Sequence, residues 1–270
     1  MPQIPPLYDL LAIGLTIFLA IGIHEYCHAK FAEMAGDPTP SYFGRVTLNL
    51  TKHFELMGTI MIVITSLAGV GIGWGKPVPM DPSKMRNPKW DHFIAVAAGP
   101  ASNFIQAAVF ALLLRLALMS SPEFGETLGS VLNGRGIEDP VQTQGFAMAF
   151  LAAWWFQAVI INVALCLFNL IPIGPLDGMW LLGTFLSPPT RLKWTRFNLT
   201  VGGMLFLGLI LFSQLSNVKI IERVIGPPLV TIVKFLIGFY PMAERKRILS
   251  GMRANNPRLH LGNYEGALRN

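Results

Sequence analysis

Long blocks of apolar residues, separated by short polar connections, make up most of the chain. A helix that crosses the hydrocarbon core of a bilayer needs about 20 mostly apolar residues. Because the apolar residues are contiguous rather than at amphipathic spacing, the pattern predicts an all-α polytopic membrane protein. It predicts five transmembrane helices, over residues 7–35, 92–119, 145–172, 199–216 and 225–243.

A sixth apolar block, residues 56–75, ends in a run where glycine alternates with other residues from Gly69 to Gly75. Each glycine destabilises a helix by about 1 kcal/mol relative to alanine. Irregular backbone is tolerated at membrane depth only where it packs in protein or lines water. We therefore expect 56–75 to be a re-entrant or half-depth segment that enters and leaves the bilayer on the same side.

The polar connection after the first predicted span carries a different pattern. Residues 42–50 alternate at period two and are rich in residues with high β-propensity. They predict a short β element, either a strand or a hairpin. No internal repeat and no linker follows, so we expect one membrane domain over residues 1–243 and a basic tail over 244–270.

Composition agrees with a membrane protein. The chain is 52% hydrophobic and 13% charged, whereas soluble domains average about 25% charged residues. The net charge of +6 does not indicate a nucleic-acid partner, because the basic residues lie between apolar blocks and in the tail. Cys27 and Cys166 both lie in apolar segments, which disfavours a structural disulfide. No basic region precedes Leu7, so we expect no cleaved signal peptide.

The basic residues also orient the predicted spans. Residues 37–91 carry six Lys/Arg, 178–198 carry three, and the tail 244–270 carries six. Residues 120–144 carry one Arg against four acids, and 217–224 carry two basic residues. The positive-inside rule places the first group in the cytoplasm and the second outside. The N-terminus is then outside and the C-terminus cytoplasmic, a parity that five crossings satisfy and six do not.

The first span contains an H-E-x-x-H motif, which runs from His24 through Glu25 to His28. Positions i and i+4 of a helix share one face, so both imidazoles can reach one metal ion. Glu25 is turned aside, which suits a base acting on metal-bound water. A five-residue motif can occur by chance, but ionisable groups inside a lipid-spanning helix are energetically unfavourable and functional by default. The motif therefore predicts a zinc site.

Catalytic zinc usually has three protein ligands and one water molecule. Asp177 is the ionisable residue of the later apolar blocks with a fitting context, since Pro172 and Pro175 break the helix before it and Gly178 frees the turn after it. At about 1.5 Å per residue, His24 lies near the cytoplasmic end of its helix. The span before Asp177 runs toward the same side. Both half-sites are therefore expected at one depth.

Three motifs together resemble the site-2 protease family of intramembrane metalloproteases: the H-E-x-x-H sequence, Gly99-Pro100-Ala101-Ser102-Asn103, and the run from Asn169 to Gly178. The resemblance covers residues 20–180 and implies one zinc per chain on His24, His28 and Asp177. It implies that Gly99, Pro100 and Asn103 start a helix packed against the site, and that Asn169 assists the substrate or the transition state. The chain lacks the inserted PDZ domain and the C-terminal CBS pair of some members.

The resulting hypothesis is a zinc endopeptidase that hydrolyses membrane-protein substrates in or next to their transmembrane helices. Glu25 would take a proton from the zinc-bound water and deliver it to the leaving amine. Asn103 or Asn169 would donate to the developing oxyanion, and residues 42–50 would offer an edge for the extended substrate. The expected setting is a prokaryotic cytoplasmic membrane, with the site near the cytoplasmic face.

Two other functions use the same residues. A metal-ion transporter or sensor could employ the histidines, although transporters tend to carry polar groups along a whole pathway, and Glu25 would then have no role. A non-proteolytic family member is the second alternative, although all three ligands and the base are present. Cleavage that depends on Glu25 and is blocked by a chelator distinguishes the protease from both.

Overall fold

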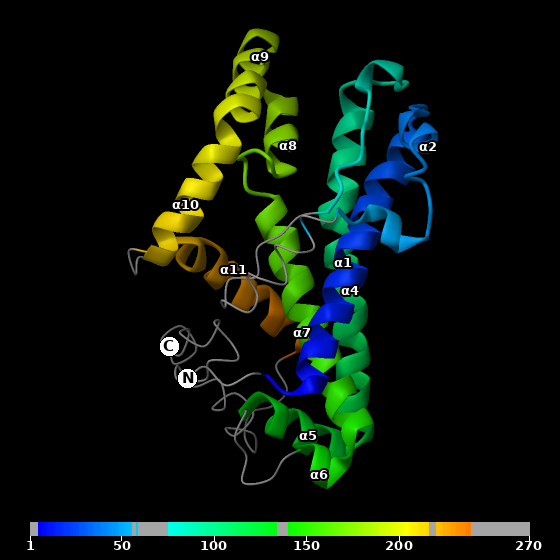
Figure 1. The fold of residues 1–270 in the computed structure, drawn as a ribbon, viewed down its shortest axis with the longest axis vertical. Coiled ribbons are helices and arrows are strands. Elements are labelled where there is room, and N and C mark those ends of the chain that lie inside the picture. Colours follow the sequence, from blue (N-terminus) through cyan, green and yellow to red (C-terminus); the bar gives the residue numbers. More distant parts are fainter. Residues whose placement is uncertain (1–4, 56–57, 59–74, 134–139, 216–219, 239–270) are drawn as a thin grey trace. The chain divides into compact units, whose positions relative to one another are not determined.

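The structure is a computed structural model that describes residues 5–55, 58, 75–133, 140–215 and 220–238 (Figure 1). Nearly all regular structure in these residues is helical. The longer helices are α1 (Leu7–Met34), α4 (Trp90–Ser120), α5 (Pro122–Asn133), α7 (Phe146–Asn169), α9 (Pro188–Phe197), α10 (Gly203–Leu215) and α11 (Ile220–Ile237). The shorter elements are α2 (Thr39–Tyr42), η1 (Leu50–His53), η2 (Pro82–Lys84), α6 (Pro140–Gln144), α8 (Gly178–Phe185) and the π-helix η3 (Asn198–Gly202).

The all-α prediction is confirmed for these residues, and four helices are long and apolar enough to cross a membrane. They are α1, α4, α7 and the continuous helix Pro188–Ser213, formed by α9, η3 and most of α10. The predicted count of five is not supported, because the 18 residues of α11 carry three charged side chains and two internal prolines. The predicted segment 56–75 and the tail 244–270 lie, apart from residues 58 and 75, outside the described residues.

The chain divides into two compact units. One comprises residues 1–17, 106–163 and 222–270, and its apolar core joins side chains of α1, α4, α5 and α7. Tyr8, Leu114, Phe124 and Phe156 are buried in this core. The other unit comprises residues 18–105 and 164–221, and all the residues predicted for the functional site belong to it.

The predicted β element at 42–50 does not form. Tyr42 ends the short helix α2, Gly44 adopts a left-handed φ of +63°, and no strand follows before η1. The alternation reflects another arrangement, in which Arg45 is buried while Tyr42 and Leu48 are 80% and 75% exposed. A strand needs a partner along its length, and the nearest β pairing is a single antiparallel bridge between Phe54 and Gly75.

Two helices differ from their predicted bounds in ways that affect the site. The resemblance implied that Gly99 and Pro100 start a helix. Helix α4 instead begins at Trp90, so both residues lie inside it. The predicted span 199–216 begins 11 residues after Pro188, where the continuous helical path of α9, η3 and α10 starts (Figure 1). The first part of this path, α9, is polar and carries three basic residues. A hydropathy criterion therefore did not include it in the predicted helix.

Candidate metal centre

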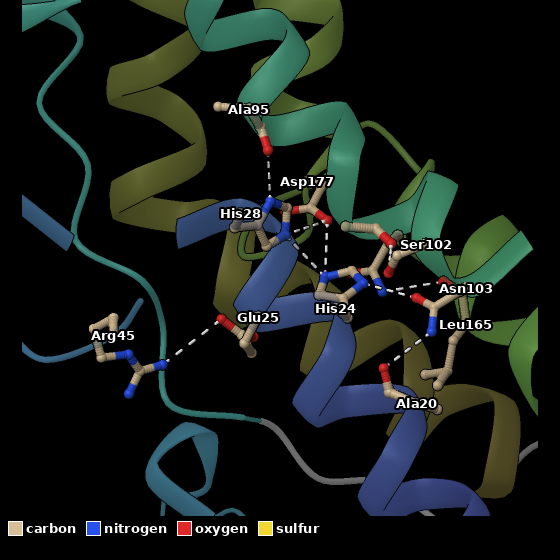
Figure 2. Close-up of polar contacts among 12 residues, drawn as sticks. Ala20, His24, Glu25, His28, Arg45, Ala95, Ser102, Asn103, Leu165 and Asp177 are labelled. Atoms are coloured by element: carbon tan, nitrogen blue, oxygen red, sulfur yellow. Dashed lines mark hydrogen bonds and ion pairs between the residues drawn. The ribbon is translucent and has the colours of Figure 1, made fainter. Parts of the chain in front are cut away.

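Helix α1 places the two histidines of the H-E-x-x-H motif on one face. The Nε2 atoms of His24 and His28 lie 2.9 Å apart, and the rings stand nearly perpendicular, at 86°. Both residues are buried, with exposed fractions of 8% and 4%. The predicted i, i+4 arrangement is therefore present, one turn apart on the helix (Figure 2).

Asp177 is presented by the irregular segment between α7 and α8. One carboxylate oxygen of Asp177, Oδ2, lies 3.3 Å from the Nε2 atom of each histidine. Gly178 is required directly after it, because a Cβ atom at that position would overlap the backbone carbonyl of Ile171. The sequence selected Asp177 from its proline and glycine neighbours, and the structure brings it to the histidines. Among the described residues, His24, His28 and Asp177 form the group able to hold a metal ion.

The spacing of the three atoms fits zinc. Zinc binds histidine nitrogen at about 2.0–2.1 Å and carboxylate oxygen at about 2.0–2.2 Å, usually with tetrahedral geometry. Two ligands of such a tetrahedron are therefore separated by ~3.3 Å. The observed separations of 2.9, 3.3 and 3.3 Å approximate one triangular face. The fourth position, on the opposite side, would remain for water or substrate.

The outer nitrogens of the two rings determine which nitrogens face the centre. His28 Nδ1 lies 2.9 Å from the carbonyl oxygen of Ala95, which can only accept, so this nitrogen carries the proton. His24 Nδ1 lies 2.7 Å from Asn103 Oδ1, whose amide nitrogen donates to the carbonyl oxygen of Ala20 at 3.1 Å. In the neutral rings both Nε2 atoms therefore present lone pairs to each other and to a carboxylate. A bound metal cation would stabilise such a convergence of electron pairs.

Electrostatics at Asp177 agree with a ligand role. Burial by itself would raise the pKa of the Asp177 carboxyl, but the neighbouring His28 and His24 outweigh this effect and hold the pKa below its usual value. The carboxylate is therefore ionised at neutral pH. Its Oδ2 atom is buried and lies 3.3 Å from the Nε2 atom of each imidazole, and no other described residue donates a hydrogen bond to it.

Glu25 lies beside the three converging atoms and points away from them, toward Arg45 (Figure 2). Its Oε2 atom is 4.0 Å from a guanidinium nitrogen of Arg45, and its side chain is 14% exposed. Arg45 is itself buried and donates to the backbone carbonyls of Lys52, at 2.7 Å, and of Lys76. Burial lowers the pKa of the Arg45 guanidinium, and the charge of Glu25 opposes that shift. Arginine nevertheless stays protonated in proteins.

The two asparagines have different environments. Asn103 is fully buried, and its carbonyl and amide groups contact His24 and Ala20 as described. Asn169 is half-buried at the end of α7, where its amide nitrogen donates to the carbonyl oxygen of Leu165 at 3.0 Å. The structure thus places Asn103 directly against a candidate ligand, whereas Asn169 contacts its own helix.

Sequence reasoning missed two residues at the site, Arg45 and Asn198, and gave a third, Gly99, only a place at the start of a packed helix. Gly99 of α4 faces the imidazoles so closely that a Cβ atom there would overlap the ring of His28 and lie 2.8 Å from that of His24. Arg45 was assigned to a β element, and Asn198 was the last residue of the polar connection 178–198. The signals available were weak: a glycine in an apolar helix, a lone arginine in a polar connection, and an asparagine near a helix start.

Comparison with known proteins agrees with the geometry. The model of Peptidase family M50 matches residues 12–209. A relative in Bacillus subtilis (strain 168), named "Putative zinc metalloprotease YwhC", is 30% identical over 193 residues, which is 72% of this chain and 77% of the relative. No solved structure matches the chain significantly.

Proposed function

The chain belongs to peptidase family M50 and is a zinc metalloprotease, and from this premise we propose that it cleaves membrane proteins in or next to their transmembrane segments. One observation carries the proposal: two candidate ligands lie on α1 and the third lies in the segment after α7, and both helices are apolar enough to cross a membrane. A hydrolytic site in that position meets substrates that are themselves embedded in the bilayer.

We assign one zinc ion per chain to His24, His28 and Asp177. Bound there, zinc would supply Lewis-acid activation for amide hydrolysis. The chain supports the ligands from outside, because Asn103 and the Ala95 carbonyl accept the Nδ1 protons and keep Nε2 free. Such outer contacts fix the ring orientation and typically change metal affinity 10- to 100-fold when removed.

Glu25 is the proposed general base. It follows the first candidate ligand, His24, directly in the sequence, and it is not one of the three candidate ligands. Its carboxylate is partly accessible. It would take a proton from the attacking water molecule and deliver it to the leaving amine nitrogen. A guanidinium nitrogen of Arg45 lies 4.0 Å from this carboxylate.

The oxyanion role predicted for Asn103 or Asn169 remains a proposal for Asn169 only. Asn103 is buried and already contacts His24 and Ala20, so we propose that it orients His24 and does not contact substrate. Asn169 lies eight residues before Asp177 on the adjoining helix, and one rotamer change would release its amide nitrogen from Leu165.

We propose the orientation that the positive-inside rule indicates. The N-terminus would lie outside, the tail 244–270 in the cytoplasm, and the metal centre near the cytoplasmic face of a prokaryotic membrane. The basic residues Arg191, Lys193 and Arg196 of α9 support this arrangement, since α9 follows Asp177 on the same side.

The two alternative functions have less support. A transporter would need polar groups along a path, whereas the acidic, basic and histidine side chains of α1, apart from Asp9 in its first turn, lie in the second half of the helix, and two of them belong to the candidate centre. A non-proteolytic member would not need Glu25 in addition to the three ligands. The family match and the relative's name both favour hydrolysis.

Replacement of Glu25 by Gln is the direct test. Purified protein with a tagged single-span substrate should lose activity by about 10²- to 10⁴-fold, because the proton acceptor is removed while size is kept. Zinc content by elemental analysis should be unchanged, and a chelator should abolish the wild-type activity.

Glu33→Gln is the matched control, because Glu33 lies on the same helix and pairs with Lys30 outside the site. It should cleave like the wild type. Full activity of Glu25→Gln would refute the base assignment, and chelator-resistant cleavage would refute the metalloprotease mechanism.

A further inference from the structure

Asn198 is a buried polar residue on the helix α9–η3–α10, outside the motifs that define the metal centre. It is 3% exposed and starts the π-helix η3. Single π-helical turns inside α-helices are rare and frequently lie at functional sites. Its neighbours Leu199 and Thr200 are exposed, and Gly202 is the other buried residue of this π-helix.

The side chain of Asn198 holds the segment that presents Asp177. Its Oδ1 atom accepts a hydrogen bond of 2.7 Å from the backbone N–H of Gly174, and its Nδ2 atom donates to the carbonyl oxygen of Trp194 at 3.0 Å. Gly174 lies three residues before Asp177, between two prolines that have no N–H to donate. The buried N–H of Gly174 is therefore satisfied by a side chain from a distant helix.

Close packing makes this contact specific. A Cβ atom at Gly202 would lie 3.2 Å from the backbone nitrogen of Gly174 and 3.1 Å from Asn198 Oδ1. A Cβ atom at Gly174 would lie 2.9 Å from the backbone oxygen of Asn198. The backbones of η3 and of the Asp177 segment thus approach each other through two glycines, which leaves little room for Gly174 to shift.

A second bond from the same helix holds the other side of Asp177. The indole Nε1 of Trp194 donates to the carbonyl oxygen of Met179 at 2.8 Å, two residues after Asp177. Met179 is itself buried at 2% exposure. Helix α9 and η3 therefore contact the segment three residues before Asp177 and two residues after it.

We propose that Asn198 and Trp194 are positioning residues for Asp177, so that zinc affinity depends on a helix that provides no ligand. The inference rests on the assignment of Asp177 as a ligand. An aspartate on an irregular segment has several available positions, and fixing both flanks holds its Oδ2 atom 3.3 Å from the histidines. Outer contacts of this kind raise metal affinity by restricting the ligand to its binding position.

The test measures zinc binding by the full-length protein in detergent, by competition with a chelator of known affinity. Asn198→Ala and Trp194→Phe should each weaken zinc binding by about 10- to 100-fold. Thr200→Ala, an exposed position in the same π-helix, should bind zinc like the wild type. Excess zinc should restore kcat in Asn198→Ala, because the ligands themselves are intact.

Asp177→Ala separates this inference from the assignment on which it rests. If Asp177→Ala binds zinc normally, the ligand assignment is wrong. If Asp177→Ala loses zinc while Asn198→Ala and Trp194→Phe keep wild-type affinity, the positioning role alone is refuted. Should Asn198→Ala not fold, as judged by its thermal transition, Trp194→Phe decides, since it keeps an aromatic side chain and removes the N–H donor.

Discussion

Gly99 is the residue of α4 that comes closest to the imidazole rings of His24 and His28. Any larger residue would place its Cβ atom against both rings, overlapping that of His28. The same helix supplies the Ala95 carbonyl and the Asn103 side chain that accept the Nδ1 protons. One face of α4, over two turns, therefore provides both the hydrogen-bond acceptors and the space that the two ligands require.

Gly99→Ala should separate helix stability from metal binding. Alanine favours a helix by about 1 kcal/mol over glycine, so helix content by circular dichroism should not fall. The added methyl group overlaps the rings, so zinc affinity and peptidase activity should both drop, affinity by at least about 10-fold. Chelator competition and substrate cleavage measure the two effects.

Gly208→Ala is the control for this change. Gly208 lies in α10, in the same unit, and nothing lies within 4 Å of a Cβ atom built there. It should keep wild-type zinc affinity and activity. Normal zinc binding in Gly99→Ala would mean that α4 and α1 can separate without loss of the site.

The residues proposed to carry the chemistry could be predicted from the sequence, whereas the residues that hold them in place could not. His24, Glu25 and His28 form a local pattern on one helix, and Asp177 stands out as a carboxylate among prolines and glycines in an apolar block. Gly99 and Asn198 act through contacts with segments that are distant in the chain. Only a three-dimensional arrangement identifies such contacts.

Among the elements, the connection between α1 and α4 depends on one buried cation. Arg45 donates to the carbonyl of Lys52 beside η1 and to that of Lys76, which follows the bridge between Phe54 and Gly75. The backbone N–H of Lys76 also donates to the carbonyl oxygen of His53 at 2.7 Å. Arg45 thus joins two parts of the connection, and one of its guanidinium nitrogens also lies 4.0 Å from the Glu25 carboxylate.

Arg45→Met should destabilise this connection while keeping an unbranched side chain that can fill part of the same space. Two partly buried carbonyl groups would lose their donor, which lowers the free energy of unfolding by about 1–3 kcal/mol. Activity should fall as well, because Glu25 loses its neighbouring positive charge. Thermal unfolding in detergent and steady-state kinetics measure these changes.

Lys52→Met provides the comparison, because Lys52 is exposed and engages Arg45 only through its backbone. It should unfold and cleave like the wild type. An Arg45→Met protein with unchanged unfolding would show that water satisfies the two carbonyls equally well.

Hydropathy predicted the long apolar helices, because their length and apolar content are enough to identify them. The strand predicted at 42–50 does not form, because a short alternating segment becomes a strand only when a second strand pairs with it. In this segment Arg45 is buried, and the aromatic side chains of Tyr42 and Phe43 are exposed. The start of the helix at Pro188 was missed because its first ten residues are polar.

For the whole molecule, the decisive observation concerns the two ends of the connection 35–89. The backbone N–H of Arg86 donates to the carbonyl oxygen of Ala35 at 3.0 Å, and Ala32, Ala35, Met85 and Ala95 pack together. The chain therefore leaves α1 and enters α4 at the same level. A bilayer core is about 30 Å thick, so the two ends lie on one side of any membrane that α1 and α4 cross.

Cysteine labelling in intact cells tests whether both ends of the connection 35–89 lie on the same side of the membrane, and which side that is. In a variant without Cys27 and Cys166, single cysteines at the exposed positions Tyr42, Lys89 and Glu123 should divide into two groups. Tyr42→Cys and Lys89→Cys should react with a membrane-impermeant maleimide only after lysis, because positive-inside charge places both in the cytoplasm. Glu123→Cys, beyond α4, should react in intact cells. Opposite results for Tyr42→Cys and Lys89→Cys would contradict the antiparallel pairing of α1 and α4 on which the metal centre depends, whereas a common but external result would reverse only the proposed orientation.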